Sequence, residues 1–274
     1  MKYGVVLPGG DPLEQIELAV AAEKAGWDGL FVAELAYGID AWTLLGAMAV
    51  RTQTLRLGTL LTPLPWRRPW KVASQAMTLD RISGGRAILS IGLGAPDAAL
   101  GDFGEESARS RRAEHLDDGL DLMAALWDGS LEFEGQHVRM NLEHRFDRDN
   151  LPMPVQQPRV PIWVVGAWPK PKSMRRVLRA DGLLPNVFDE TVFRPAVPAD
   201  IVAMIAWLDD NGGRRPGFDV VSEGETPADD AAQAAGVVAP WEAAGATWWI
   251  ESRWTAGMEA IKERVAAGPP RATR

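Results

Sequence analysis

Acidic side chains follow several short apolar runs in this sequence, where they could exchange protons with a substrate. Glu34 follows a run near the N-terminus, and Glu223 and Glu251 end two runs nearer the C-terminus. Paired carboxylates that face one substrate support acid–base or glycosidic chemistry without a cofactor. The alternative is that these acids form structural ion pairs, with Arg253 or Arg194 as the partner of Glu251.

Other reactive side chains are few. The chain has no cysteine, so thiolate nucleophiles, cysteine-based metal sites and disulfides are excluded. His115, His137 and His144 match no metal-ligand spacing, and they fall in a helical pattern and a connecting segment rather than after apolar runs. We therefore predict no metal site and no catalytic histidine.

The composition restricts the partners. With 29 basic and 37 acidic residues the formal charge is −8, which disfavours nucleic acid and anionic membranes as general partners. No apolar run reaches the roughly 18 residues of a membrane span. A strand pattern that begins at Lys2 leaves no room for a secretory signal. We expect a soluble, cytoplasmic protein that acts on a small molecule.

Short apolar runs alternate with longer amphipathic ones along the whole chain. The predicted strands are Lys2–Pro8, Gly29–Glu34, Arg56–Thr62, Arg86–Gly92, Ile162–Gly166, Gly182–Val187, Phe218–Glu223 and Thr247–Ser252. The predicted helices are Pro12–Ala25, Ala41–Arg51, Trp70–Ile82, Arg111–Trp127, Lys172–Ala180, Pro198–Asp210, Asp229–Ala244 and Met258–Ala267. In the first helix, the period places Ile16, Val20 and Ala21 on the inward face.

Eight such units predict an α/β fold of the (β/α)8 TIM-barrel type, formed by residues 1–274 as a single domain. The alternative is an open doubly wound sheet, which has the same local pattern. The segment Asp128–Arg159, between the fourth helix and the fifth strand, is an insertion that we expect on the lower face of the barrel.

Glycines mark the end of the fourth strand. Gly84 and Gly85 end the third helix, and Gly92 and Gly94 follow the strand that comes next. Active sites of these barrels lie at the C-terminal ends of the strands. The missing side chains there would let a flat or bulky ligand approach the backbone.

A set of short motifs resembles one family. The motifs are Leu57-Gly58-Thr59, Thr62-Pro63-Leu64, Arg68-Pro69, Thr78-Leu79-Asp80-Arg81, Ser83-Gly84-Gly85-Arg86 and Ile91-Gly92-Leu93-Gly94. Together they are similar to the central signature of the luciferase-like monooxygenase superfamily. Further likeness in Ala22–Asp28, Leu126–Gly129, Pro161–Gly166 and Arg179–Gly182 extends the resemblance over roughly residues 1–190.

The resemblance implies a barrel, usually in a homodimer, that binds FMN or the deazaflavin coenzyme F420 at its C-terminal mouth. It also implies a bulge at the end of the third strand, often with a non-proline cis peptide, that supports the ring. The implied cofactor-binding residues are Leu60 and Leu61 in the bulge, Leu93 and Gly94 after strand four, and Gly166, Ala167 and Trp168 after strand five.

The phosphate position rests on a physical argument as well as on the resemblance. Backbone N–H groups at a helix start favour an anion, and Lys170 and Lys172 lie close by. For Arg175, Arg176 and Arg179 we prefer a solvated helix face. Trp168 is also the tryptophan that we expect to stack on the ring or substrate.

Departures from the family pattern guide the choice of catalytic residues. Many members have a histidine just after strand two, preceded by an acid, whereas this chain has Glu34 and Leu35 there. Ala95 replaces the acid of the branch that oxidises sugar phosphates, which argues against that activity. Glu34 is then the best polar candidate near the ring, with Tyr37 as a donor on the following loop. The alternative for Glu34 is a structural carboxylate bonded to loop amides.

The sequence thus predicts a flavin-dependent monooxygenase that uses reduced FMN and oxygen on a small organic substrate, with a separate flavin reductase as partner. The first alternative is an F420-dependent hydride-transfer oxidoreductase of the same fold. A second is a cofactor-free hydrolase or isomerase that relies on Glu34, Glu223 and Glu251. A third is a non-catalytic flavin-binding subunit.

Overall fold

The computed structural model describes residues 1–94 and 101–271. Ala95, at which the chain departs from the sugar-phosphate branch, lies outside the described residues. Within the described part of the chain, no helix is both long and apolar enough to span a membrane.

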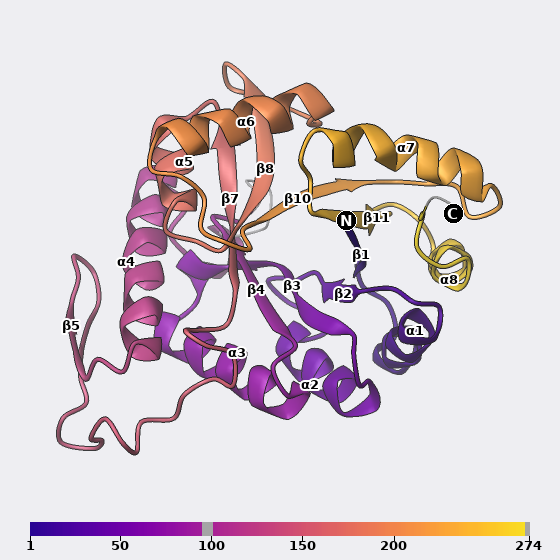
Figure 1. The fold of residues 1–274 in the computed structure, drawn as a ribbon. Helices are drawn as coiled ribbons and strands as arrows, with labels where there is room; N and C mark the ends of the chain where they lie inside the picture. The colour runs from indigo at the N-terminus through magenta and orange to yellow at the C-terminus, as the bar shows by residue number, and fades with distance from the viewer. Residues whose placement is uncertain (95–100, 272–274) are drawn as a thin grey trace.

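Eight parallel strands form a closed barrel, as predicted (Figure 1). They are β1 (Lys2–Leu7), β2 (Gly29–Val32), β3 (Arg56–Pro63), β4 (Ala87–Gly92), β7 (Ile162–Trp168), β8 (Gly182–Asp189), β10 (Asp219–Gly224) and β11 (Trp248–Ser252). The pairing of β10 with β8 closes the ring. This closure excludes the open doubly wound sheet.

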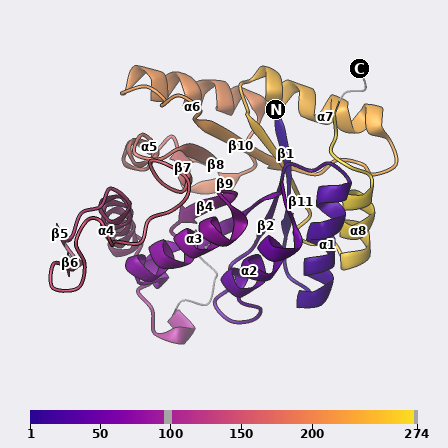
Figure 2. The same ribbon diagram turned by 60° about the horizontal axis from the view of Figure 1, so that its bottom comes forward.

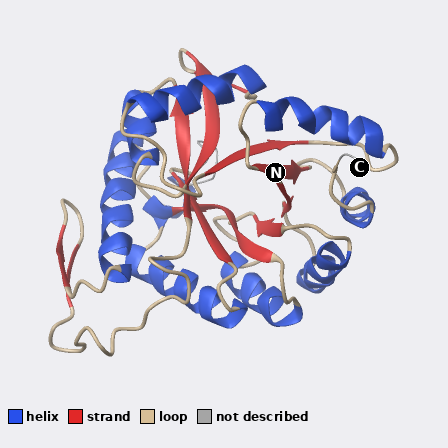
Figure 3. Ribbon diagram, in the orientation of Figure 1, coloured by secondary structure: helices blue, strands red, loops and turns tan. Residues whose placement is uncertain are grey.

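Eight helices surround the strands (Figures 2 and 3). They are α1 (Pro12–Lys24), α2 (Ala41–Arg51), α3 (Pro69–Ser83), α4 (Arg109–Trp127), α5 (Pro171–Val177), α6 (Pro198–Asp210), α7 (Ala231–Ala243) and α8 (Met258–Ala266). Strand β7 runs two residues beyond its predicted end, because it continues to pair with β8 as far as Trp168 and Val187. Strand β8 also runs two residues further than predicted, to Asp189. Beyond that, β8 pairs with the antiparallel strand β9 (Val192–Arg194).

Successive side chains of each strand point alternately into the lumen and toward the helices, so they form two apolar layers. Phe31, Trp163 and Trp248 pack together in the lumen, with ring centroids 5.2–5.9 Å apart. Leu30 and Val32 on the opposite face of β2 belong to the larger cluster beneath the helices. The strand tryptophans in the lumen are therefore packing residues.

The inward face of α1 differs from the prediction. Its buried residues are Gln15, Leu18, Ala19 and Ala22, whereas Ala21 is exposed and Ile16 and Val20 are only partly buried. Alanines let the helix approach the strands closely, so the small residues face the barrel. The larger β-branched side chains lie at the edge of the contact.

Residues of the family-like motifs hold the barrel together at its N-terminal side. The buried carboxylate of Asp80 accepts hydrogen bonds from the backbone N–H groups of Val155 (2.7 Å) and Gln156 (2.9 Å). Arg86 donates to the carbonyl oxygens of Ala49 and Thr52, at and just beyond the end of α2. The motifs that contain Asp80 and Arg86 are therefore explained by architecture rather than by chemistry.

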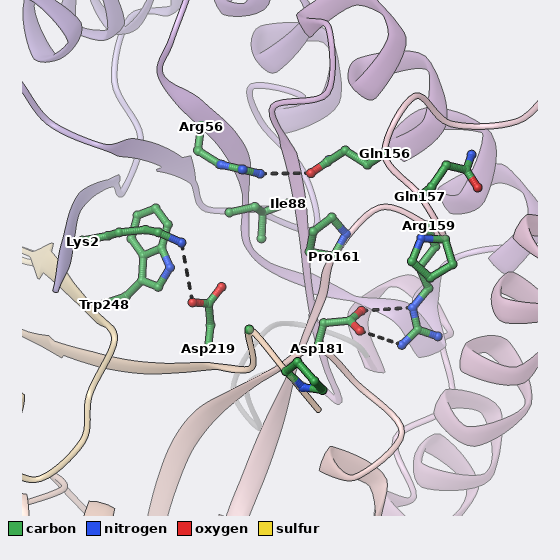
Figure 4. A pocket seen from close by; sticks show the side chains of 13 residues that line it. Lys2, Arg56, Ile88, Gln156, Gln157, Arg159, Pro161, Asp181, Asp219 and Trp248 are labelled. Carbon is green, nitrogen blue, oxygen red and sulfur yellow. Dashed lines mark hydrogen bonds and ion pairs between the residues drawn. The ribbon is translucent and has the colours of Figure 1, made fainter. Parts of the chain in front are cut away.

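The insertion contains the antiparallel hairpin of β5 (Glu132–Glu134) and β6 (Arg139–Asn141), which lies beside α4 (Figure 1). Its last part, Gln156–Arg159, returns to the lower face as expected. There it borders a pocket of about 250 Å³ together with Lys2, Arg56 and Asp219, at the starts of three strands (Figure 4). This pocket lies at the opposite end of the barrel from the predicted active site.

Candidate active site at the C-terminal mouth of the barrel

The third strand contains the expected bulge. Its pairing with β4 shifts register between Thr59 and Thr62, and the peptide bond between Leu60 and Leu61 is cis. Leu60 packs in the lumen cluster, and Leu61 lies partly exposed at its edge. The implied bulge and cis bond are confirmed, while the contact of these two leucines with a cofactor remains a prediction.

A hydrogen-bonded network lies behind this bulge. The Glu34 carboxylate accepts from Thr62 Oγ1 (2.6 Å) and Trp42 Nε1 (3.2 Å), and it forms an ion pair with Arg67. The Thr62 hydroxyl also lies 2.9 Å from the hydroxyl of Thr59. Glu34 thereby connects β2 to both sides of the bulge and to the start of α2.

The environment of Glu34 pulls its pKa in two directions. Burial raises the pKa of Glu34, because its side chain is only 6% exposed, while the Thr62 hydrogen bond, the Arg67 charge and the Trp42 hydrogen bond lower it in part. Its partners are side chains rather than the loop amides of the structural alternative. This geometry gives Glu34 a positioning role behind the strand.

Tyr37 stands apart from this network. Its side chain is 87% exposed on the loop between β2 and α2. Nothing in the described structure pairs it with Glu34, so the two predicted catalytic residues do not form a unit here. A role for Tyr37 requires the loop to meet a bound ligand and remains a prediction.

Neighbouring side chains closely approach the two glycines at the end of the fourth strand. A Cβ at Gly92 would lie 2.9 Å from Val165 Cγ2 and 3.1 Å from Leu61 Cδ2. Gly94 has a positive φ of 81°, and a Cβ there would lie 2.9 Å from the Trp66 ring. Both positions therefore need glycine for close approach.

Two further polar groups lie near this strand end. The carbonyl of Leu93 accepts a hydrogen bond from Arg112 (3.0 Å). The buried Trp66 Nε1 has no hydrogen-bond partner within the described structure. Gly94 thus lies beside a buried N–H group without a partner among the described residues, and the contact of Leu93 and Gly94 with a cofactor remains a prediction.

The predicted phosphate cradle is part of a strand. Gly166, Ala167 and Trp168 continue β7, and the Ala167 N–H already donates to Ser173 Oγ (2.9 Å). The α-carbon of Gly166 faces α5, where a Cβ would lie 3.0 Å from Met174 Sδ. Trp168 packs against the outer apolar cluster. A phosphate at this position would therefore have to displace a bond that the chain already makes.

Two of the basic residues that follow form ion pairs with acidic side chains of α4. Arg176 binds the Asp117 carboxylate (2.8 Å), and Arg179 pairs with Asp117 and Asp121. Lys170 donates to a backbone carbonyl (2.6 Å). These contacts fix α5 against its neighbour, so Arg176 and Arg179 form ion pairs, and the predicted solvated helix face is wrong for these two residues.

The acids at the last two strand ends point to opposite faces. Glu251 is 1% exposed and lies outside the lumen, where it accepts from Thr226 N (2.8 Å) and pairs with Arg253 (3.3 Å) and Arg264 (3.5 Å). Glu223 is two residues after Val221 of the lumen cluster and so faces the mouth. The suggested acid pair is therefore wrong, because strand alternation separates the two carboxylates.

The sequence leaves Arg253 and Arg194 as candidate ion-pair partners of Glu251. In the structure Arg253 pairs with Glu251 and Arg194 does not. Arg194 instead pairs with Asp189 (3.1 Å) and Asp200 (2.7 Å). Glu251 is therefore a structural carboxylate, and of the two predicted partners it pairs with Arg253.

Sequence reasoning missed a polar layer above the lumen cluster. Ser90, Asn186 and Ser252 each follow a lumen residue by two positions, as Glu223 does. The buried Ser90 hydroxyl has no hydrogen-bond partner within the described part of the chain. Assigning which alternate residues of each strand face the lumen would identify these residues, because side chains two positions apart lie on the same face.

The histidines lie away from the mouth. His137 Nε2 is 3.1 Å from a carboxylate oxygen of Glu114, and its ring packs on His115. Over residues 1–94 and 101–271, no three acidic, histidine or cysteine side chains gather as a metal site would require.

Comparison with known proteins gives one family model, described as luciferase-like monooxygenase, that matches residues 2–263. A putative coenzyme F420-dependent oxidoreductase of Mycobacterium tuberculosis is 32% identical over 215 residues, which is 75% of this chain and 58% of that relative. 4-Hydroxyprotoasukamycin monooxygenase of Streptomyces nodosus subsp. asukaensis is 34% identical over 119 residues, 40% of this chain and 32% of that enzyme. This chain thus spans less than two thirds of either relative.

Among solved structures, an F420-dependent secondary alcohol dehydrogenase in complex with an F420–acetone adduct superposes with a TM-score of 0.78. The match covers 97% of each chain at 16% identity. At that identity the likeness shows a shared fold.

Proposed function

The chain belongs to the luciferase-like monooxygenase family, and on that premise we propose that it is an oxidoreductase that binds a flavin-type ring at the C-terminal mouth. Such a ring, once bound, supplies hydride transfer or, with oxygen, oxygen insertion. The protein then needs to orient the ring and the substrate and to exclude water. This matches a mouth with few free acid–base groups.

The observation that carries the proposal is the surface formed by three adjacent strands. Leu61 and Val165 present apolar side chains at the upper edge of the lumen, and Gly92 between them has none. A planar ring fits against such a surface. Ser90, beneath Gly92 on the same face of β4, offers an unused hydroxyl. The residues present therefore fit the ring of the cofactor better than its phosphate.

Glu34 supports this surface from behind. Its bonds to Thr62 and Arg67 hold the bulge that presents Leu61. We assign it a positioning role, because its carboxylate oxygens are already occupied by three side chains. Tyr37 would contact the ligand from the exposed loop.

Between the two rings we place coenzyme F420 first. Its support is the relative that matches three quarters of this chain and is named as a putative F420-dependent oxidoreductase. FMN with oxygen is the second candidate, supported by the shorter match to a named monooxygenase. In the FMN case, a separate reductase would supply reduced flavin.

Titration of the purified protein with F420 and with FMN, followed by fluorescence and calorimetry, tests the proposal. We expect one of the two to bind. Gly92→Ala should weaken that binding about tenfold, because a methyl group at 2.9 Å from Val165 overpacks the surface by roughly 1–3 kcal/mol. Gly46→Ala is the matched control, since its Cβ would meet no atom within 4 Å.

Binding of neither cofactor would overturn the proposal. Tight binding without turnover on any substrate would instead favour the non-catalytic flavin-binding subunit. Equal loss of affinity in both variants would show that Gly92 does not line the site.

We further propose a homodimer as the working form, following the resemblance of the motifs. Light scattering coupled to gel filtration would test it, and a mass equal to one 29.8 kDa chain would refute it.

A further inference from the structure

The acids that follow barrel strands differ in what their oxygens already bind. Glu34 and Glu251 are buried and bonded to arginine and hydroxyl groups. Glu223 forms no ion pair within the described part of the chain. It is therefore the strand-end carboxylate with oxygens left to act on a ligand.

Glu223 also faces the place where a ligand would lie. Its side chain lies on the same face of β10 as that of Val221, and Glu223 is paired with Ile250 of β11. Both Val221 and Ile250 belong to the lumen cluster. Its side chain is exposed, so the carboxylate is reached from the mouth. Trp254, which follows β11 and is 47% exposed, lies close enough to donate a hydrogen bond to it.

The surroundings keep Glu223 near its titration point at neutral pH. Desolvation by the barrel wall raises the pKa of Glu223 to about 7, and the hydrogen bond from Trp254 acts in the opposite direction. Because the residue is exposed at the mouth, water screens the carboxylate and limits this rise in the free protein.

No charged group acts on the pKa of Glu223 in the described part of the chain, and the nearest charges in sequence on the two flanking strands are paired elsewhere. On the β11 side, Arg253 lies 3.3 Å from Glu251 and 3.8 Å from Glu225. On the β8 side, Asp189 pairs with Arg194. The charge state of Glu223 is therefore governed by its solvation, which a bound ligand would change.

We propose that Glu223 is the catalytic acid–base residue that exchanges a proton with an alcohol or carbonyl substrate at the mouth. The inference rests on the proposed function in its hydride-transfer form. In the oxidation, the C–H bond of the alcohol breaks and its electron pair leaves with the hydride to the cofactor. The O–H proton passes to the Glu223 carboxylate, and a C=O bond forms. In the reduction, protonated Glu223 returns the proton to the carbonyl oxygen.

Proton uptake on cofactor binding tests the position of Glu223 without any turnover. Calorimetric titrations with F420, and with FMN, would be run near pH 7 in two buffers that differ in ionisation enthalpy. A ring that covers the mouth removes water from Glu223 and raises its pKa further, so the wild-type protein should take up as much as about half a proton. Glu223→Gln should lack this uptake. Glu225→Gln, the same change on an exposed neighbour, should retain it.

Turnover with a panel of primary and secondary alcohols and their carbonyl partners tests the catalytic role. Glu223→Gln should lower kcat/KM about 10²–10⁴-fold and remove the pH limb near 7. Glu223→Asp should restore part of both, and cofactor affinity should change less than about threefold in either variant, which shows that they fold.

The outcomes separate the two claims. If neither cofactor binds the wild-type protein, the proposed function fails and this inference falls with it. If a cofactor binds and Glu223→Gln keeps the proton uptake and the pH limb, the inference alone is overturned.

Discussion

Removing the Thr62 hydroxyl should release the bulge of β3 from its support. Thr62→Val keeps the shape of the side chain and deletes only its hydrogen bonds. The hydroxyl donates to Glu34 at 2.6 Å and lies 2.9 Å from the hydroxyl of Thr59, and both threonines are fully buried. No water can replace these bonds without rearrangement.

The magnitude follows from those two contacts. A hydrogen bond to a buried charged group contributes about 1.5–3 kcal/mol, and the Thr59 hydroxyl loses its shorter partner as well. Thr62→Val should therefore lower the free energy of unfolding by about 2–3 kcal/mol. For 274 residues, at about 2.1 cal/mol/K per residue, that is a fall in Tm of about 4 °C.

The loss should grow with pH. Because burial raises the pKa of Glu34, its contribution to stability is present below the unfolded-state pKa and is lost as the pH rises through the folded-state pKa. Thr62 is one of the groups that limit this shift, so the variant moves the folded-state pKa of Glu34 higher. The stability difference from wild type should be larger at pH 8 than at pH 5.

Urea unfolding at several pH values, followed by tryptophan fluorescence, would measure these differences. Thr78→Val is the control, because the Thr78 hydroxyl bonds only to the exposed carbonyl of Ser74 on α3, and it should cost less than about 0.5 kcal/mol. A loss for Thr62→Val no larger than that of the control, or one that shrinks as the pH rises, would refute the assigned role of Glu34.

Three further substitutions test other parts of the structure. Gly46→Ala, within α2, should raise the free energy of unfolding by about 0.5–1 kcal/mol, and a lower melting temperature would contradict this. Asp80→Ala should lower it by about 2–4 kcal/mol in urea, because two backbone N–H groups of the insertion lose their acceptor; a near-neutral effect would show that the insertion is held by other contacts. Glu251→Ala should cost about 3–5 kcal/mol, since Arg264, which is 2% exposed, keeps a buried charge without its carboxylate, and loss of activity with unchanged stability would instead return Glu251 to the active site.

The fold could be predicted because its signals are local. Apolar runs bounded by glycines give the strands, and their alternation with helical periods gives the order of the barrel. The family-like motifs add to this, since Asp80 and Arg86 hold the N-terminal side of the barrel. For the same reason they identify an architecture and leave the cofactor and substrate open.

The site could be predicted only in part. The bulge at Leu60 and Leu61 was implied by resemblance and is present. The sequence predicts that the fifth strand ends at Gly166, two residues early, because only pairing with β8 shows that the strand continues. The sequence also predicts that Trp168 stacks on the ring, whereas its side chain packs against the outer apolar cluster.

The sequence by itself determined that eight strands and eight helices alternate, and that acids follow several of the strands. Tertiary structure alone decided which of those acids can meet a ligand. Strands of a parallel barrel are apolar on both faces, so the sequence does not show which alternate residues face the lumen. Glu223 and Glu251 occupy similar places in the sequence, but the closure of the barrel turns Glu223 to the mouth and Glu251 toward Arg264 beneath the helices.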